Sequence, residues 1–248
     1  MKYQDKVVVI TGAGGGIGRA AALAYAKEGA RVVIADIKAD ILEETRAMIG
    51  ERVLAVPTNV ADHEQVKHLM DRTLETFGRI DIGINNAGIG AAKQAKTHDT
   101  DPADWNRVIA VNQTGVYFCM REQLRHMTEQ GSGCIVNVAS VAGHRAMAHQ
   151  IAYTASKHAV VGMTKAAALE YARRNIRINS VCPVFTNSPM LENLFKVAPK
   201  AREGLVHTIP VGRYGENADV LHAMFYLTDP AASFVTGLNL PVDGGMMA

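Results

Sequence analysis

The sequence predicts an α/β protein in which one doubly wound parallel sheet carries helices on both faces. Short runs rich in β-branched residues alternate with longer segments of helical periodicity along the 248 residues. The runs are almost continuously apolar, as strands covered on both faces are. Strand, helix and strand follow one another without a break, and right-handed crossovers between parallel strands then place helices on both faces.

The expected elements follow one another in order along the chain. The strands are Val7–Ile10, Val32–Ala35, Val53–Val56, Ile80–Ile84, Cys134–Ala139, Ile176–Cys182 and Leu238–Val242. The helices are Ile17–Glu28, Asp40–Ile49, His63–Phe77, Trp105–Thr128, Ala152–Arg173 and Ala218–Leu227. Because no linker, low-complexity tract or repeat interrupts this alternation, we expect residues 1–248 to form a single domain.

The region Pro183–Gly215 is less regular than the rest. It contains Pro189, Pro199 and Pro210 together with short helical pieces. A long irregular segment beside the carboxyl edge of a sheet is often a binding loop. We therefore expect a substrate lid at about residues 188–215.

Composition and charge exclude several classes of protein. The formal net charge is only +2, and the basic residues are scattered, which gives no reason to expect a nucleic-acid partner. The three cysteines are widely spaced and odd in number, which argues against a disulfide framework, and no ligand spacing predicts a metal. No stretch is long and apolar enough for a membrane span or a signal peptide. We expect a cytoplasmic protein that binds neither membrane nor metal.

A glycine-rich turn follows the first expected strand. Its sequence, TGAGGGIG, runs from Thr11 to Gly18 and opens a helix. Glycines permit a sharp turn and a close approach of a ligand to the backbone. The helix that follows offers unpaired N–H groups to a pyrophosphate. Asp36 ends the second strand, close to the position about 20 residues on where a carboxylate binds the adenosine ribose. Such a carboxylate repels the extra phosphate of NADP, so these features together predict NAD.

Tyr153 and Lys157 stand four residues apart among small side chains, in IAYTASKHAV. Residues i and i+4 of a helix lie on one face. A free phenol has a pKa near 10, too high for a good base at neutral pH, and a nearby ammonium is expected to lower it. The small neighbours leave room for a cofactor beside the helix.

Several motifs together resemble the short-chain dehydrogenase/reductase family. The turn has the spacing TGxxxGxG, with glycines at 12, 16 and 18. NNAG ends the fourth strand, Asn112 lies in VNQTG, Ser140 ends the fifth strand in NVAS, and YTASK follows. With the glycines Gly244 and Gly245 near the end, the resemblance covers nearly the whole chain. It implies a Rossmann-type fold, the doubly wound sheet already predicted.

The resemblance also implies the roles of individual residues. Tyr153 is then the acid/base that exchanges the alcohol proton, and Lys157 holds the nicotinamide ribose and tunes Tyr153. Ser140 hydrogen-bonds the substrate oxygen, and Asn112 supports a proton path from Lys157. The residues implied for the cofactor are Gly12, Gly15, Gly16, Ile17, Gly18, Asp36, Ile37, Asn59, Val60, Asn86, Gly88, Tyr153, Lys157, Pro183, Val184, Thr186 and Ser188. Those implied for the substrate are Ser140, Gln150, Tyr153 and Met190.

The chain departs from the family pattern at three of these positions. Asn59 stands where the family usually has an acidic residue against adenine, and we expect a modest weakening at most. Val184 replaces the glycine of a Pro-Gly pair, which is expected to narrow the nicotinamide site or shift its loop. Ser188 replaces a common threonine and keeps the hydroxyl. Members that use NADP usually have a basic residue at the position of Gly15 or Ile37, and neither is basic here, although Lys38 is nearby.

The sequence therefore predicts an NAD(H)-dependent oxidoreductase that interconverts a secondary alcohol and a ketone. Two alternatives stay open: a 3-oxoacyl-thioester reductase, and a binding protein that only senses NAD(H). The segment Ser188–Pro199, with Met147 and Val184, places apolar side chains near the expected site, which suits a compact apolar or cyclic substrate. Family members commonly pair the long helices across a two-fold axis, so we expect a homotetramer, or at least a dimer.

Overall fold

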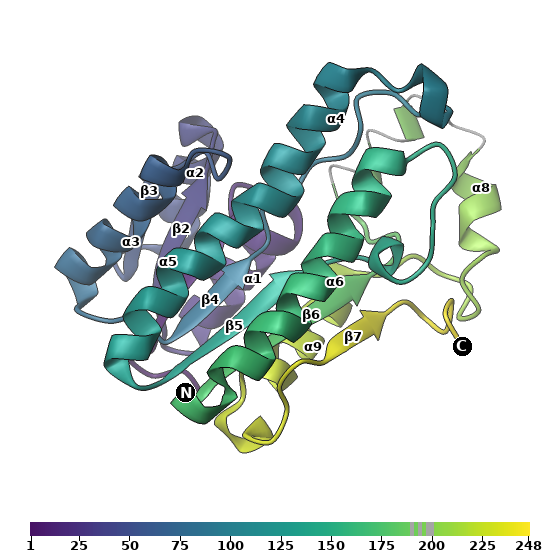
Figure 1. The fold of residues 1–248 in the computed structure, drawn as a ribbon. Helices are drawn as coiled ribbons and strands as arrows, with labels where there is room; N and C mark the ends of the chain where they lie inside the picture. The colour runs from purple at the N-terminus through teal and green to yellow at the C-terminus, as the bar shows by residue number, and fades with distance from the viewer. Residues whose placement is uncertain (189–190, 193–194, 197–200) are drawn as a thin grey trace.

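A computed structural model describes residues 1–188, 191–192, 195–196 and 201–248. Its centre is one seven-stranded sheet with the order β3-β2-β1-β4-β5-β6-β7, all neighbours parallel (Figure 1). The strands are β1 (Val7–Thr11), β2 (Arg31–Asp36), β3 (Val53–Pro57), β4 (Ile82–Asn85), β5 (Gly133–Val138), β6 (Ile176–Pro183) and β7 (Asn239–Val242). The predicted fold class is confirmed.

The strand order reverses between β1 and β4. The chain moves outward from β1 to β2 and β3, then returns to β4 beside β1 and continues outward the other way. At such a switch point the loops at the carboxyl ends of the two strands diverge and leave a crevice, which is where ligands bind in open α/β sheets. The turn after β1 and the NNAG motif after β4 both lie at this switch point.

Helices cover both faces of the sheet, as Figure 1 shows. One face carries α3 (His63–Phe77), α5 (Gly115–Gln130) and α6 (Ile151–Tyr171), whose apolar side chains form the larger core with the sheet. The other face carries α1 (Gly16–Lys27), α2 (Ala39–Ile49) and α9 (Asn217–Thr228), which form the second core. Strands that are buried on both faces have to be apolar throughout, which explains their continuous Val and Ile content.

The helix expected at Trp105–Thr128 begins earlier and is interrupted. It starts as α4 (Pro102–Ile109), where the Asp101 side chain caps the end by accepting from Ala103 N, and a proline occupies the first turn. A π-helical segment, Ala110–Thr114, then joins it to α5. Single π turns inside helices occur frequently at functional sites.

A chain of buried amide side chains connects the strands and helices of the larger core. Asn85 on β4 exchanges hydrogen bonds with Gln123 on α5, at 2.9 and 3.1 Å. Asn85 also donates to Asn137 on β5 at 2.9 Å, and Asn137 donates to Thr164 on α6 at 2.9 Å. All four residues are buried, so an unpaired group among them would be costly. The network therefore fixes how α5 and α6 lie on the sheet.

The irregular region after β6 includes the short helix α8 (Ala201–Val206). The two ends of this region are joined to each other by an isolated parallel bridge between Thr186 and Gly215. In Figure 1, α8 and the C-terminus lie on the same side of the molecule. Of the residues expected in the lid, Pro189, Met190, Leu194 and Pro199 lie outside the described residues.

Candidate active site

The glycine turn after β1 is held in a conformation that only glycine accepts readily. Gly12 has a φ of +67°. A Cβ on Gly18 would lie 2.1 Å from the carbonyl oxygen of Gly12, so the helix start packs directly on the turn. The Asn86 side chain donates to the carbonyl oxygens of Thr11, at 3.0 Å, and Gly12, at 3.1 Å. Asn86, which directly follows β4, thus holds the glycine turn after β1 in place through its carboxamide.

The first turn of α1 is open to an anion. Gly15 is the residue at its N-terminal cap, no side chain caps the helix, and the first turn, which starts at Gly16, contains no acidic residue. Ile17 packs against the second core. Because the first N–H groups of a helix have no partner within the helix and lie at the positive end of its dipole, this end fits a pyrophosphate.

The Asp36 carboxylate is fixed at the end of β2. One oxygen accepts from Gly14 N at 3.0 Å and the other from Lys38 N at 3.2 Å. The neighbouring Ile37 side chain is 65% exposed, which leaves a surface for a planar base. Arg19, a cation on α1, is directed to α2, where it donates to Thr45 at 2.9 Å. The end of β2 therefore presents a carboxylate that two backbone N–H groups hold in place.

Ser140 follows the end of β5 and faces the loop after β6. Its hydroxyl accepts from Ala142 N at 3.1 Å and donates to the carbonyl oxygen of Pro183 at 3.5 Å. Tyr153 lies in the first turn of α6, near enough to Ser140 for the serine hydroxyl to lower the pKa of its phenol, although burial has the larger and opposite effect. The structure therefore brings Ser140 and Tyr153 together, as the sequence predicts.

Lys157 is buried, with 4% of its surface exposed. Its ammonium donates to the carbonyl oxygen of Val138 at 2.8 Å and lies 5.7 Å from the centroid of the Tyr153 ring. A Cβ on Gly88 would lie 3.6 Å from Lys157 Nζ, so the glycine of NNAG leaves space beside the ammonium. Burial disfavours the charged amine and lowers the pKa of Lys157 to about 8.

The expected lowering of the Tyr153 pKa by the ammonium is not seen. Burial raises the pKa of the Tyr153 phenol above its ordinary value, and the hydrogen bond with Ser140 offsets only part of this. The ammonium contacts the face of the ring and the Val138 carbonyl instead of the phenolic oxygen. Of the two groups, Lys157 is therefore the one whose pKa is shifted toward neutral pH.

Asn112 lies in the π-helical segment and pairs with the loop after β4. Its carboxamide accepts from Ile89 N at 2.8 Å and donates to Ile89 O at 2.9 Å. It also donates to the Ser156 hydroxyl at 3.3 Å, and Ser156 in turn donates to the Tyr153 carbonyl at 2.7 Å. The extra residue of the π turn thus connects the β4 loop to the helix that carries Tyr153 and Lys157.

Comparison with known proteins identifies the family. Residues 12–247 match a family model described as enoyl-(acyl carrier protein) reductase. Levodione reductase of Leifsonia aquatica is 39% identical, over 100% of this chain and 96% of that protein. The chain belongs to the short-chain dehydrogenase/reductase family. It is an oxidoreductase of that family.

Other relatives show how wide the family is. Cis-4-hydroxycyclohexanecarboxylate dehydrogenase of Sinomonas cyclohexanicum is 40% identical, over 99% of this chain and 98% of that protein. A 3-oxoacyl-[acyl-carrier-protein] reductase of Thermotoga maritima is 39% identical over the whole of both chains. The crystal structure of levodione reductase superimposes with a TM-score of 0.95, over 98% of each chain, at 39% identity. That of NAD⁺-bound xylitol dehydrogenase superimposes with a TM-score of 0.94, over 99% of this chain and 100% of that one, at 34% identity.

The residues at which this short-chain dehydrogenase/reductase departs from the pattern have structural explanations. The side-chain oxygen of Asn59 accepts from Ala61 N at 3.1 Å, so it shapes the turn after β3. Val60 is buried against Gly115, where a Cβ would lie 2.8 Å from a Val60 methyl group. Val184 is only 9% exposed and belongs to a separate apolar cluster, so its side chain is directed into packing.

The loop after β6 is bonded to its surroundings residue by residue. Val184 N donates to Val242 O at 3.2 Å, at the end of β7. Thr186 is buried and donates to Val184 O at 2.9 Å. The Ser188 hydroxyl accepts from Leu191 N at 3.4 Å and starts a helical turn. Pro183 to Ser188 therefore form a fixed edge beside Ser140.

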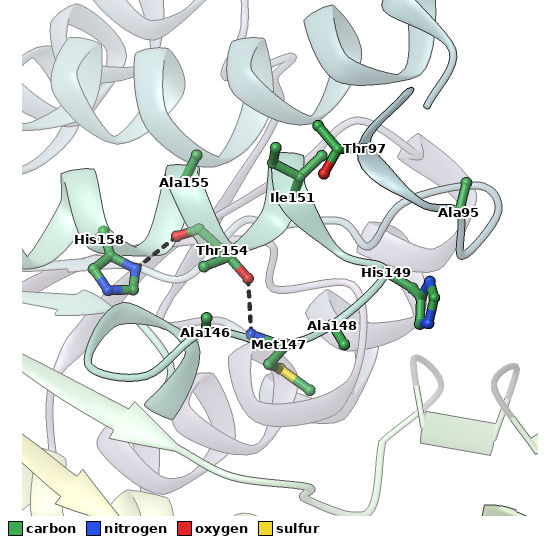
Figure 2. A pocket seen from close by; sticks show the side chains of 10 residues that line it. All are labelled: Ala95, Thr97, Ala146, Met147, Ala148, His149, Ile151, Thr154, Ala155 and His158. Carbon is green, nitrogen blue, oxygen red and sulfur yellow. Dashed lines mark hydrogen bonds between the residues drawn. The ribbon is translucent and has the colours of Figure 1, made fainter. Parts of the chain in front are cut away.

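A hollow of about 460 Å³ lies beside the start of α6 (Figure 2). It is lined by Ala95, Thr97, Ala146, Met147, Ala148, His149, Ile151, Thr154, Ala155 and His158. Thr154 and His158, one helical turn apart, line the hollow. Tyr153 and Lys157 each precede one of them by one residue, so they point about 100° away around the helix axis. Met147, expected at the substrate, lines this hollow. The hollow is therefore distinct from the catalytic face of α6.

Gln150, expected at the substrate, is the residue directly before α6, and its side chain does not cap the helix. Met190 lies outside the described residues. No group of three or more His, Cys, Asp or Glu in the described part of the chain is arranged to hold a metal ion. No helix among the described residues combines the length and apolar character that crossing a bilayer requires.

Three contacts in the site were not foreseen from the sequence. They are the Val138 carbonyl that accepts from Lys157, the Ser156 hydroxyl between Asn112 and α6, and the Thr11 hydroxyl that accepts from Asn86 N and Ala87 N, both at 3.1 Å. Thr11 could have been found, because it is the first letter of the TGxxxGxG motif. The Val138 carbonyl carries no side-chain signal at all.

Proposed function

We propose that this oxidoreductase uses NAD(H) to interconvert a compact, mainly apolar or cyclic secondary alcohol and the corresponding ketone. The observation that carries the proposal is the placement of Ser140, Tyr153 and Lys157 at the same edge of the sheet as an anion-ready helix start and the fixed Asp36 carboxylate. Catalytic groups and a dinucleotide cradle then meet at the switch point of the sheet.

The proposed chemistry assigns one task to each side chain. The bound nicotinamide supplies or accepts the hydride, and the protein supplies orientation and electrostatics. In ketone reduction, Ser140 donates a hydrogen bond to the carbonyl oxygen, and Tyr153 gives its phenolic proton to the same oxygen. In alcohol oxidation the proton returns to Tyr153. Asn112 holds the β4 loop beside Lys157, which places the amine where it can replace that proton.

NAD(H) is proposed over NADP(H) because of Asp36. Its carboxylate lies at the end of β2 with both oxygens bonded to backbone N–H groups, so it is held in place. A phosphate on the neighbouring ribose would meet this charge. The NAD⁺-bound xylitol dehydrogenase, at 34% identity, supports the same choice.

The substrate class follows from the apolar character of the expected pocket. Ser140 and Tyr153 are the fixed polar groups there, and the apolar cluster of Val141, Val184 and Ile209 directly adjoins Ser140. Buried hydroxyls or charges of a sugar or dicarboxylate would lack partners. Two relatives are named for cyclic compounds, levodione and a hydroxycyclohexanecarboxylate, which supports a ring-shaped substrate.

A second candidate is a 3-oxoacyl-thioester reductase, favoured by the Thermotoga maritima relative at 39% identity. The same Ser140, Tyr153 and Lys157 serve that reaction, so the catalytic groups do not separate the two. A third candidate only senses NAD(H), and the presence of all three groups speaks against it. The three cysteines, all free and buried, support a cytoplasmic location for any of these.

We propose a homotetramer, or at least a dimer. On the outer faces of α5 and α6, Tyr117 is 50% exposed and Leu169 is 85% exposed, and Phe234 near the C-terminal strand is fully exposed. Large exposed apolar side chains on long helices are typical of interfaces between subunits.

A panel of ketones tests the proposed function. With NADH, we expect kcat/KM for cyclic and aryl-alkyl ketones to exceed that for free sugars and 3-oxoacyl thioesters, measured by loss of NADH absorbance. Higher kcat/KM for a 3-oxoacyl thioester would favour the second candidate. Binding of NADH without turnover of any compound would favour the third.

Cofactor preference should change at Asp36. We expect the Asp36→Ala, Ile37→Arg double variant to lower the ratio of kcat/KM for NADH over NADPH by roughly 100-fold or more, because a like-charge contact costs several kcal/mol. Asp40→Ala, an exposed carboxylate on α2, is the matched control. A wild-type protein that prefers NADPH would contradict this assignment.

Removing the phenolic hydroxyl should stop the chemistry without removing the cofactor. Tyr153→Phe is expected to lower kcat by roughly 100- to 10,000-fold, the usual contribution of general acid–base catalysis. The dissociation constant for NADH, followed by fluorescence, should change little. Substantial remaining turnover would show that the proton comes from another group.

The Tyr153–Lys157 pair should give a pH dependence near pH 8. Below the lowered pKa of Lys157, about 8, both groups hold their protons and the pair cannot accept one from an alcohol. Alcohol oxidation should therefore rise as pH increases through 8, and ketone reduction should fall. Lys157→Arg keeps its proton and should remove the rise. A flat profile of the wild type in a chemistry-limited assay would contradict the pairing.

The assembly state can be measured directly. Light scattering at micromolar concentration should give the mass of a tetramer or dimer of the 26.7 kDa chain. Leu169→Glu should shift the mass downward, since a charge would be buried in the interface. A monomeric wild type would reject the assembly.

A further inference from the structure

The structure contains a third apolar cluster that is separate from the two cores on the sheet faces. Its buried members are Val141, Val184 and Ile209, at 4%, 9% and 2% exposure. Phe185, Tyr214, Met246 and Met247 pack against it and are partly buried. The cluster therefore joins four segments far apart in sequence: the loop after β5, the loop after β6, the region around residue 209, and the last residues of the chain.

This cluster directly adjoins the proposed reaction site. Val141 follows Ser140 in the chain, and Val184 follows Pro183, and Ser140 and Pro183 are themselves hydrogen-bonded at 3.5 Å. Val141 and Val184 are each bonded in the chain to one partner of this hydrogen bond. A change in their packing is therefore expected to move Ser140 or Pro183.

The C-terminal residues are held against the cluster by specific bonds. After β7, the Asp243 carboxylate accepts from Gly245 N at 3.0 Å and from Met247 N at 2.9 Å, which closes a tight turn. Gly244, with a φ of +59°, accepts at its carbonyl from Val211 N at 3.2 Å. A Cβ on Gly244 would lie 2.5 Å from a Val211 methyl group, so the two segments touch closely.

The cluster also supports the region expected to cover the substrate. The Tyr214 hydroxyl donates to the Arg202 carbonyl on α8, and the Tyr214 ring lies 5.6 Å from the Phe195 ring. Arg202 in turn lies over Phe195, 5.0 Å from its centroid. Contacts thus run from the C-terminal methionines through Tyr214 to the described residues of the lid.

We propose that Val184, Met246 and Met247 determine substrate size, because together they fix the wall formed by the loop after β6 and the lid base next to Ser140. This proposal rests on the proposed ketone reductase function. Val184 packs in one cluster with Val141 and Ile209, and the unbranched methionines, which adapt to irregular spaces, pack against that cluster. The wall is then set close to the reacting oxygen, which favours a compact ring over a longer or branched ketone.

Truncating these side chains should enlarge the accepted substrates. In Val184→Gly and in Met247→Ala, we expect the ratio of kcat/KM for a bulky aryl-alkyl ketone over cyclohexanone to rise about 10-fold, the effect of a few methylene groups in an apolar pocket. The double variant should be non-additive, because both changes act on one wall. Two control variants should leave the ratio unchanged. Val220→Ala removes methyl groups from the second core, which α1, α2 and α9 form with the sheet, and Met48→Ala changes an exposed side chain. A ratio within two-fold of wild type in both test variants would overturn the proposal.

A second measurement does not depend on turnover. Hydrogen–deuterium exchange should increase in peptides covering residues 183–188 and 205–215 when Met246 and Met247 are both changed to alanine, with β1 to β4 unaffected. Unchanged exchange there would refute the role of the C-terminus. If the wild type reduces no ketone, the proposed function fails, and the exchange result alone then decides whether the C-terminal methionines hold this wall.

Discussion

The arrangement of the site depends on the buried amide network between β4, β5, α5 and α6. Gln123, Asn85, Asn137 and Thr164 are all buried, and hydrogen bonds link them in that order. An amide in an apolar interior has to keep its partners, and this fixes the register of both helices against both strands. The NNAG motif follows β4 and Ser140 follows β5. The π turn with Asn112 precedes α5, and α6 carries Tyr153 and Lys157. The network therefore positions catalytic groups that it does not touch.

The position of α5 matters because of the π turn at its start. Asn112 pairs with both the N–H and the carbonyl of Ile89, so the β4 loop is bonded to a helix whose register is already set. The same carboxamide reaches Ser156, on the helix that carries Tyr153 and Lys157. An uninterrupted α-helix through residues 110–114 would rotate Asn112 by about 100° relative to the residues after it, because each residue advances the helix by that angle. The irregular turn is thus what allows one side chain to serve both neighbours.

Burial of Lys157 shifts the balance of the catalytic pair. An ammonium with 4% exposure loses most of its hydration, and one carbonyl and one aromatic face replace only part of it. The amine therefore releases its proton near pH 8, far below its ordinary pKa, while the phenol holds its proton more strongly than in water. A pair of this kind changes protonation as a unit within the range in which enzymes work.

Local patterns in the sequence were sufficient for the fold and for much of the site. Strands buried on both faces need continuous β-branched runs, the glycine turn needs residues without a Cβ, and residues four apart in a helix share a face, so each feature leaves a short-range signature. The π turn leaves none, because the residues on either side keep a helical pattern. The sequence places an ammonium beside Tyr153 but does not show how deeply either is buried, and so the direction of the Tyr153 pKa shift was wrong. The partners of Val184 lie at residues 209 and 246–247, too far along the chain for any local pattern to connect them.

The switch point of the sheet divides the chain into two parts with different tasks. Residues at the ends of β1, β2 and β3, among them Gly12, Asp36 and Asn59, form the cradle proposed for the dinucleotide. Residues at the ends of β5, β6 and β7 carry Ser140, the wall at Val184 and the C-terminal methionines. The two groups lie on opposite sides of the switch point between β1 and β4, and Asn86, directly after β4, bonds to the glycine turn after β1. Packing around Val184 can therefore change without altering the bonds that hold Asp36. Relatives of equal identity to this chain are named for substrates as different as levodione and a 3-oxoacyl-[acyl-carrier-protein], as expected where one fold carries different sites.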